Sequence, residues 1–143
     1  MKPNIPVSKK LILNVMYAQN IIADKLMETL KPYDISIEQF NVLRILRGQK
    51  SKPVNMGYLQ EQMVAKTSNT TRLVDKLLLK DLVDRQICPE NRRKMEVIIT
   101  EKGLKLLEIV DKLVEETEES IVSVFSEQEK EQLLTLLEKF KTS

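Results

Sequence analysis

The sequence predicts a mainly helical protein with one small β-hairpin, an α+β fold. Glycine and proline are scarce, at 3 and 5 of 143 residues, which favours long helices over many turns. Apolar residues recur at helical spacing along most of the chain, and helix-capping residues precede several of these segments. Two strand-like segments, residues 83–88 and 95–100, flank a turn-rich stretch and predict the hairpin.

Two helices are predicted before residue 48. The first covers residues 8–30, with Ser8 able to cap it, and its apolar face is wide for a helix that stands alone. The second begins at a capping box formed by Ser36 and Gln39. It ends just before Gly48, because glycine is favoured immediately after a helix C-terminus.

Two shorter helices precede the hairpin. Asn55 can cap the third, over residues 56–64. Thr67 or Ser68 can cap the fourth, which ends near Lys80. The apolar face of the fourth helix consists of Leu73, Val74, Leu77 and Leu78. This face predicts which side of the helix is buried.

Two helices follow the hairpin. A long helix is predicted over residues 101–124, with apolar residues along its length. Ser126 and Glu129 form a second capping box, which predicts the start of a last helix rich in leucine. Both chain ends therefore carry more apolar surface than a small central unit needs.

A helix pair followed by a β-hairpin is the plan of a winged helix-turn-helix. This domain is predicted over residues 35–100. Residues 1–34 and 101–143 are then the N- and C-terminal dimerisation helices, which pack together and onto a second copy. The alternative is a helical bundle formed within one chain.

The residue inventory argues against an enzyme. The chain has no histidine and only one cysteine, Cys88, which removes the commonest general base and the commonest zinc ligands. It has no glycine-rich phosphate loop, so no metal or cofactor is expected. No apolar run is long enough to cross a membrane and no signal peptide pattern is present, so a cytoplasmic location is expected.

Charge is unevenly distributed along the chain. Residues 44–102 contain 13 Lys and Arg against 7 Asp and Glu, whereas residues 103–143 contain 5 against 10. A basic middle suits a polyanionic partner, and double-stranded DNA is the one that a winged helix-turn-helix predicts. The alternative is ordinary surface charge.

The fourth helix is the predicted recognition helix. An α-helix turns by about 100° per residue. This rotation places Thr70 on the apolar side of the fourth helix, which faces inward, and leaves the opposite side polar and basic. The predicted DNA-contacting residues are Ser68, Asn69, Thr71, Arg72 and Lys76. Short polar side chains can approach bases or phosphates closely, and an arginine can bind guanine through two hydrogen bonds. The alternative is that the polar residues only cap the helix.

The hairpin tip is the predicted wing. Arg92, Arg93 and Lys94 lie beyond any core on which the hairpin could pack. A guanidinium at a wing tip can enter a narrow minor groove. A solvated basic turn is the alternative for these residues taken alone.

The segment from Leu59 to Gly103 resembles the signature of the MarR family of bacterial winged-helix regulators. That signature reads approximately T-R-L-V-D-x-L-x-x-x-G-L-V-x-R, then D-x-R in the wing, then L-T-x-x-G. The matching residues here are Thr71, Arg72, Leu73, Val74, Asp75, Leu77, Leu82, Val83, Arg85, Arg93, Thr100 and Gly103. Two departures from it matter, Asn91 in place of the wing aspartate and Asp81 in place of the turn glycine. Asn91 can still accept a hydrogen bond, and aspartate tolerates a left-handed backbone better than most residues.

The resemblance implies a homodimer that binds a pseudo-palindromic operator, with half-sites roughly 34–36 Å apart. It also implies a repressor released by a small-molecule effector between the dimerisation helices and the winged unit. The rival function is a winged-helix protein–protein interaction module without specific DNA binding.

Tyr17, Asn20 and Phe40 are the candidate effector residues, although Tyr17 and Phe40 also suit a core. Cys88, on a strand beside the wing, is interpreted as a small packed residue, with a redox sensor as the alternative.

Overall fold

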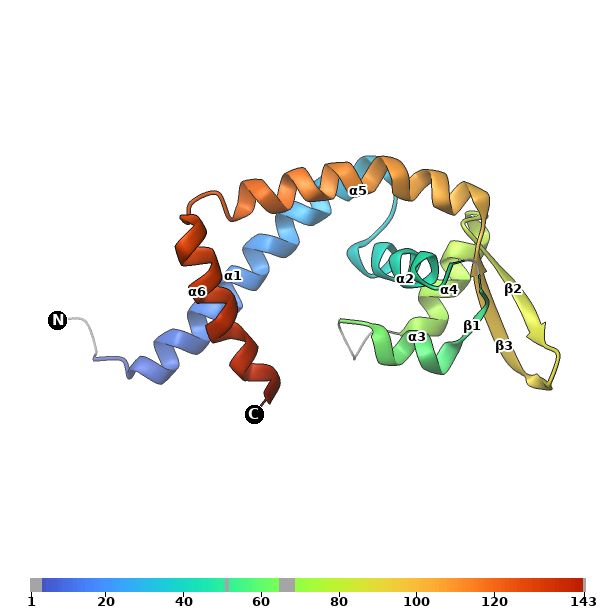
Figure 1. The fold of residues 1–143 in the computed structure, drawn as a ribbon, viewed down its shortest axis with the longest axis horizontal. Helices are drawn as coiled ribbons and strands as arrows, with labels where there is room; N and C mark the ends of the chain where they lie inside the picture. The colour runs from blue at the N-terminus through green and yellow to red at the C-terminus, as the bar shows by residue number, and fades with distance from the viewer. Residues whose placement is uncertain (1–3, 51, 65–68, 143) are drawn as a thin grey trace. The chain divides into compact units, whose positions relative to one another are not determined.

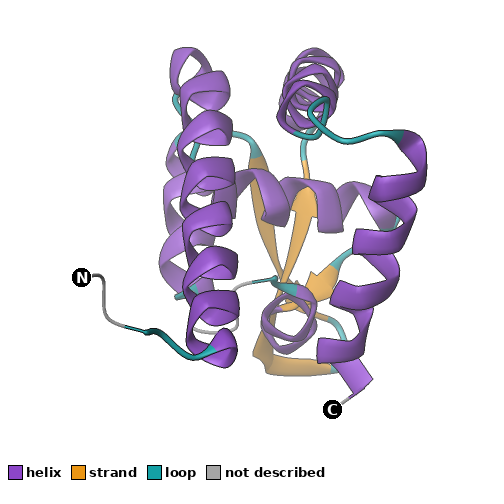
Figure 2. Cartoon of the chain, turned by 90° about the vertical axis from the view of Figure 1, so that its left-hand side faces the viewer, coloured by secondary structure: helices purple, strands orange, loops and turns teal. Residues whose placement is uncertain are grey.

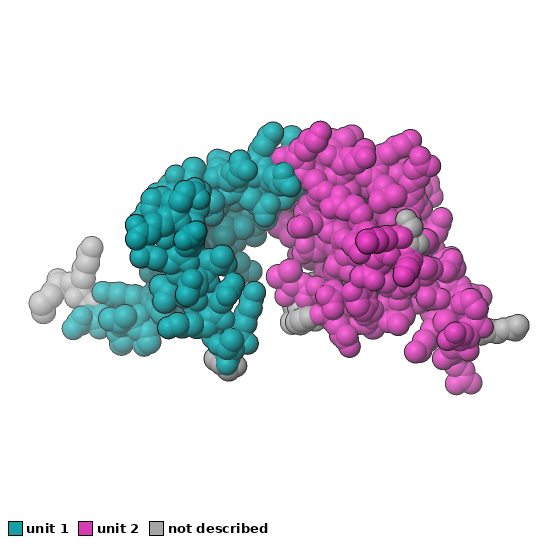
Figure 3. All heavy atoms as spheres, in the orientation of Figure 1, with its two compact units in different colours: residues 1–29, 113–143 teal, residues 30–112 magenta. Residues whose placement is uncertain are grey.

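The structure is a computed structural model, and it describes residues 4–50, 52–64 and 69–142, without the side chain of Arg92. The described chain is mostly helical with one small antiparallel sheet, as the sequence predicts (Figures 1 and 2). It forms two compact units (Figure 3). We call residues 30–112 the central unit and residues 1–29 with 113–143 the terminal unit. No helix in the described ranges is long and apolar enough to cross a membrane.

The helices of the central unit begin at side-chain caps. In α2 (Ile37–Gly48), the predicted capping box is confirmed, because Ser36 Oγ accepts from the Gln39 N–H at 3.1 Å and Gln39 Oε1 accepts from the Ser36 N–H at 3.0 Å. Gly48 is the last residue of α2 and does not follow it, since the Gln49 N–H still bonds to carbonyls of the last turn. The left-handed residue after α2 is Lys50, with φ 52°.

The two short helices have asparagine caps. Asn55 caps α3 (Met56–Gln62) as predicted, and its Oδ1 accepts from the Tyr58 N–H at 2.8 Å. The helix ends two residues before the predicted Val64, because the buried Met63 is extended. Asn69 caps α4 (Thr70–Leu79), so the prediction of Thr67 or Ser68 as the cap was wrong. Both of those residues lie outside the described ranges.

A three-stranded antiparallel sheet completes the central unit, in the order β1-β3-β2. The hairpin strands are β2 (Val83–Cys88), as predicted, and β3 (Asn91–Ile99), which starts earlier than predicted. They extend together beyond the helices of their unit (Figure 1). Strand β1 (Val54–Asn55) was not predicted, because two residues are too short for a periodic pattern. Fully buried aliphatic residues from helices and sheet form the core, among them Leu43, Leu46, Leu59, Leu77, Val83, Val97 and Leu107.

Helix α4, the predicted recognition helix, ends in a Schellman motif without glycine. The Leu82 N–H donates to Leu77 O at 3.1 Å and the Asp81 N–H to Leu78 O at 3.1 Å, the bonds that define this motif. Asp81 takes the left-handed position with φ 61°, as the sequence predicts for the residue in place of the usual glycine. Leu77 and Leu82 are both buried, so the turn also closes over the core.

The same turn receives the start of α5 (Glu101–Ile121). Thr100 Oγ1 donates to Asp81 O at 2.7 Å and accepts from the Gly103 N–H at 3.1 Å. A Cβ on Gly103 would lie 2.4 Å from Leu82 O, so only glycine allows this approach. Thr100 and Gly103 of the closing motif therefore fix the α4–β2 turn against α5.

Asp81→Gly is expected to raise the free energy of unfolding by about 0.5–1 kcal/mol, because glycine adopts the left-handed backbone without the Cβ clash. The melting temperature should rise by roughly 2–4 °C in differential scanning calorimetry. Asp81→Asn is the control, since asparagine removes the charge but tolerates the same conformation. A similar rise in Asp81→Asn would assign the effect to charge and not to backbone strain.

The terminal unit contains most of α1 (Val7–Leu30), the end of α5 and α6 (Glu127–Glu138). Ser8 lies inside the first turn of α1 and is not its cap, because the helix already begins at Val7. The capping box of α6 is confirmed, with Ser126 Oγ 3.1 Å from the Glu129 N. The predicted long helix ends at Ile121, three residues early. Short 3-10 helices follow α1 (Lys31–Tyr33) and α6 (Lys139–Thr142).

Large apolar side chains are exposed on this unit. They include Val7, Leu11, Ile12, Val15, Met16, Tyr17, Ile21, Ile22, Met27, Val124, Phe125, Leu133, Leu134, Leu136, Leu137 and Phe140. The core interpretation of Tyr17 was wrong for the single chain, because 59% of the residue is exposed. Large apolar side chains exposed together in this way are common at protein–protein contact surfaces.

Candidate nucleic-acid interface

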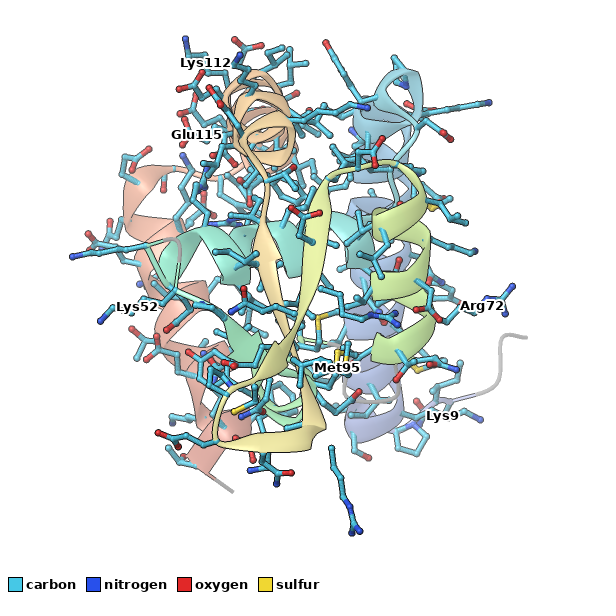
Figure 4. All side chains as sticks on the ribbon, turned by 90° about the vertical axis from the view of Figure 1, so that its right-hand side faces the viewer. Lys9, Lys52, Arg72, Met95, Lys112 and Glu115 are labelled. Carbon is cyan, nitrogen blue, oxygen red and sulfur yellow. The ribbon has the colours of Figure 1, made fainter. Side chains whose placement is uncertain are left out.

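The outward face of α4 is polar and basic. Thr71, Arg72 and Lys76 are exposed on it, and the Arg72 side chain extends away from the unit (Figure 4). No ion pair within the described residues involves the side chain of Arg72 or Lys76, so neither charge is neutralised inside the protein. Thr70 is 95% buried, as predicted, and its hydroxyl bonds to Gln60 of α3. That bond fixes the start of α4 on the preceding helix.

The start of α4 combines capping with exposure. Asn69 Oδ1 accepts from the Arg72 N–H at 3.1 Å, so the alternative interpretation of Asn69 as a cap is correct for this oxygen. The residue is nevertheless exposed, so its side-chain N–H groups remain accessible. Ser68 lies outside the described residues, and its predicted contact stays a prediction.

Asn91 braces the backbone of the wing. Its Oδ1 accepts from the Arg93 N–H at 3.0 Å, so the hydrogen bond expected of the asparagine at this position is present. The Arg93 and Lys94 side chains are exposed at the start of β3. The side chain of Arg92 lies outside the described part of the structure. The pairing register of the hairpin shifts between Ile87, which pairs with Met95, and Cys88, which pairs with Asn91.

A groove of about 610 Å³ separates α4 from the wing. Its lining residues are Asn55, Met56, Gly57, Thr71, Val74, Asp75, Arg85, Arg93, Lys94, Met95 and Val97. Three of the predicted DNA-contacting residues, Thr71, Arg93 and Lys94, therefore lie around one concave surface. A helix on one side of a groove and a hairpin on the other can bind two successive grooves of one duplex.

The Asp75–Arg85 ion pair crosses this groove and was not singled out as part of the site from the sequence. The Arg85 guanidinium of β2 donates to the Asp75 carboxylate of α4. The pair holds β2 to α4 and neutralises a carboxylate on the face that carries the predicted DNA-contacting residues. The only signal in the sequence was that both positions match the family motif.

The three candidate effector residues occupy different environments. Tyr17 and Asn20 are exposed on α1 in the terminal unit. Phe40 is 5% exposed in the central unit, so its core interpretation is correct, and Arg44 lies over its ring at 5.5 Å. Their role in binding an effector stays a prediction.

Cys88 is a partly buried free thiol at the end of β2. In the described residues, no group of three or more Cys, Asp and Glu side chains could hold a metal ion.

Known proteins resemble this chain over almost its whole length. The MarR family model matches residues 35–95. The transcriptional regulator MhqR of Bacillus subtilis (strain 168) is 29% identical over 133 residues, which cover 92% of this chain and 90% of MhqR. The crystal structure of a MarR-like transcription regulator from Bacillus cereus ATCC 10987 is 27% identical, with a TM-score of 0.85, and the match covers 94% of this chain and 96% of that one.

The winged-helix fold is also that of a mutant MarR from E. coli in complex with operator DNA, at 24% identity and a TM-score of 0.82, over 95% of this chain and 99% of that one. MhqR and the Bacillus cereus protein are both transcriptional regulators. The family motif, the winged-helix geometry and these matches agree, and the chain is similar to the MarR family of transcriptional regulators, whose family model matches its central unit.

Proposed function

We propose that the protein is a sequence-specific regulator that binds a pseudo-palindromic operator as a homodimer. Helix α4 enters the major groove, where Arg72 contacts base edges with Asn69, Thr71 and Lys76 beside it. The wing, through Arg93 and Lys94, contacts the adjacent minor groove and backbone. The observation that carries this proposal is the groove between α4 and β3, because the exposed Arg93 and Lys94 line its wing side and Thr71 lines its helix side. The exposed Arg72 and Lys76 lie on the same helix, within the same compact unit.

The homodimer is supported by the exposed apolar surface of the terminal unit. Leu134 and Leu136 of α6 are 59% and 58% exposed, and Leu11, Met16 and Ile21 of α1 are each 55% exposed. Covering such side chains with the same surface of a second copy would remove them from water and produce two-fold symmetry. The two winged units then match the two half-sites of an inverted repeat.

Selection from random-sequence DNA tests the proposal and does not require the operator to be identified first. Purified protein is incubated with a random duplex pool at about physiological salt, and bound DNA is amplified and sequenced over several rounds. Enrichment of an inverted repeat with half-site centres about 10 bp apart is expected. No enriched sequence after several rounds would argue for the interaction-module rival.

Arg93→Ala is expected to lower affinity for the selected duplex roughly five- to tenfold without lowering the melting temperature, since the side chain is exposed. Fluorescence anisotropy measures the affinity. Lys52→Ala is the matched control, because it removes one exposed positive charge from the same unit, and Lys52 points away from the side on which Arg72 lies (Figure 4). Unchanged affinity in Arg93→Ala would contradict the role of the wing.

The proposal extends to ligand-responsive repression in the cytoplasm, with Tyr17 and Asn20 among the residues that contact a small-molecule effector. It also keeps residues 35–100 as the DNA-binding domain and residues 1–34 and 101–143 as the dimerisation region. The exposed aromatic ring of Tyr17 supports the effector part. Screening small aromatic acids for release of the selected duplex tests it, and a Tyr17→Ala variant that responds unchanged would exclude this residue.

A further inference from the structure

Lys80, at the C-terminal end of α4, directs its charge into the protein. Its ammonium donates to the main-chain oxygen of Asp34 and lies 3.4 Å from Gln39 Oε1. The Asp34 carboxylate is 3.6 Å away but its side chain is 95% exposed, so that ion pair is weak. Only 30% of the Lys80 side chain is exposed. A basic residue at a recognition helix would ordinarily be expected to contact a DNA phosphate. The contacts of Lys80 are instead within the protein.

The partners of Lys80 belong to the N-terminal end of α2. Asp34 takes a left-handed conformation, with φ 55°, between the 3-10 helix and the capping box. Gln39 is buried, and its Oε1 also accepts from the Ser36 N–H in that box. The Lys80 ammonium therefore joins the end of α4 to the start of α2.

The main chain of Lys80 is held from a second direction. Lys102, in the first turn of α5, donates from Nζ to Lys80 O at 3.0 Å. The next residue, Asp81, accepts from Thr100 Oγ1 at 2.7 Å. The C-terminal end of α4 is thus fixed to both α2 and α5, while its N-terminal end carries the DNA-contacting residues.

We propose that Lys80 is a positioning residue for operator recognition, which sets the direction of α4 without touching DNA. Contacts to base edges require a defined helix direction, whereas contacts to phosphates tolerate small rotations. Loss of the Lys80 ammonium should therefore reduce discrimination between operator and other DNA more than it reduces non-specific binding. This inference rests on the proposed function.

The test compares Lys80→Met with Lys76→Met, an exposed lysine on the same helix. Both variants are titrated across a salt series against the duplex that the wild type enriches and against a scrambled duplex. In Lys80→Met, the ratio of the affinities for the two duplexes should fall roughly tenfold, as expected for the loss of one hydrogen bond to a charged group. The slope of log affinity against log salt concentration on scrambled DNA should stay unchanged. In Lys76→Met, that slope should decrease by roughly 0.9, as for one lost phosphate contact.

Two conservative variants sharpen the comparison. Lys80→Arg keeps a donor and a charge and should restore most of the ratio. Asp34→Asn removes the weak carboxylate pair, keeps the main-chain acceptor and tolerates the left-handed backbone, so it should leave the ratio unchanged. Circular dichroism establishes that each variant is folded at the assay temperature, and Lys80→Gln replaces Lys80→Met if the latter unfolds.

Each outcome is decisive. A lower melting temperature with an unchanged ratio would make Lys80 a stabilising residue only and overturn the inference. A decreased salt slope in Lys80→Met, matching that of Lys76→Met, would overturn it by showing a phosphate contact. If the wild type itself showed no preference between the two duplexes, the proposed function would fail, and this inference would fail with it. That result differs from a loss of preference in the Lys80 variants alone.

Discussion

Replacing Leu134 and Leu136 of α6 together with glutamate is expected to convert the proposed homodimer to a folded monomer and to weaken operator binding by roughly 10²–10⁴-fold. Both residues are more than half exposed in the single chain, at 59% and 58%, so glutamate is accommodated in the monomer. In the dimer, the charges would have to be buried against apolar surface, which is strongly unfavourable. The loss of affinity follows because two linked half-site contacts become independent ones.

Analytical ultracentrifugation measures the mass of the variant, and fluorescence anisotropy measures its affinity. The matched control changes Gln128 and Gln132, two exposed residues of the same helix, to glutamate. It adds the same charge without altering apolar surface, and it is expected to remain dimeric. A Leu134/Leu136 variant that stays dimeric and binds normally would exclude this face of α6 from the dimer interface.

Arg72→Ala is expected to weaken operator binding roughly 10- to 100-fold while changing the affinity for scrambled DNA much less. Arg72 is exposed and its side chain extends away from the central unit, so its removal disturbs no packing (Figure 4). A two-bond contact between arginine and guanine contributes about 1–3 kcal/mol of discrimination. Competition anisotropy with the selected duplex and with single-base variants of it measures both affinities and locates the base.

Arg72→Lys separates the shape of the side chain from its charge. Lysine keeps the positive charge but cannot form the planar two-bond contact, so it should retain non-specific binding and still lose specificity. An equal loss on every sequence, together with full rescue by lysine, would make Arg72 a phosphate contact. In that case the base-reading role would have to move to other residues of α4.

Local signals in the sequence predicted much of the fold. The capping boxes at Ser36 and Ser126 and the cap at Asn55 depend on residues within three positions of each other, so the sequence displays them directly. The left-handed turn at Asp81 was predicted from the resemblance to the family signature, in which glycine normally occupies this position. The hairpin followed from residue types, although β3 starts earlier because turn residues near the tip also pair with β2.

Contacts between distant parts of the chain could not be predicted from single positions. The groove depends on the pairing of Asp75 with Arg85 across two elements, and Lys80 looked like any other basic residue of the helix. Asn69 was predicted as a DNA contact, whereas its Oδ1 caps the helix. The residue type alone cannot decide between these two roles, because asparagine suits both. Tyr17 was interpreted as core, because periodicity does not separate burial within one chain from burial by a second chain.

Sequence-specific binding is the central claim, and one measurement tests it most directly. Fluorescence anisotropy would record the binding of the wild-type protein to DNA from upstream of its own gene, to the selected duplex and to a scrambled duplex, from about 50 to 200 mM salt. We expect a preference for the specific duplex of at least about 10³-fold, with affinity for every duplex falling steeply as salt rises. Equal, weak binding to all duplexes at every salt concentration would contradict it.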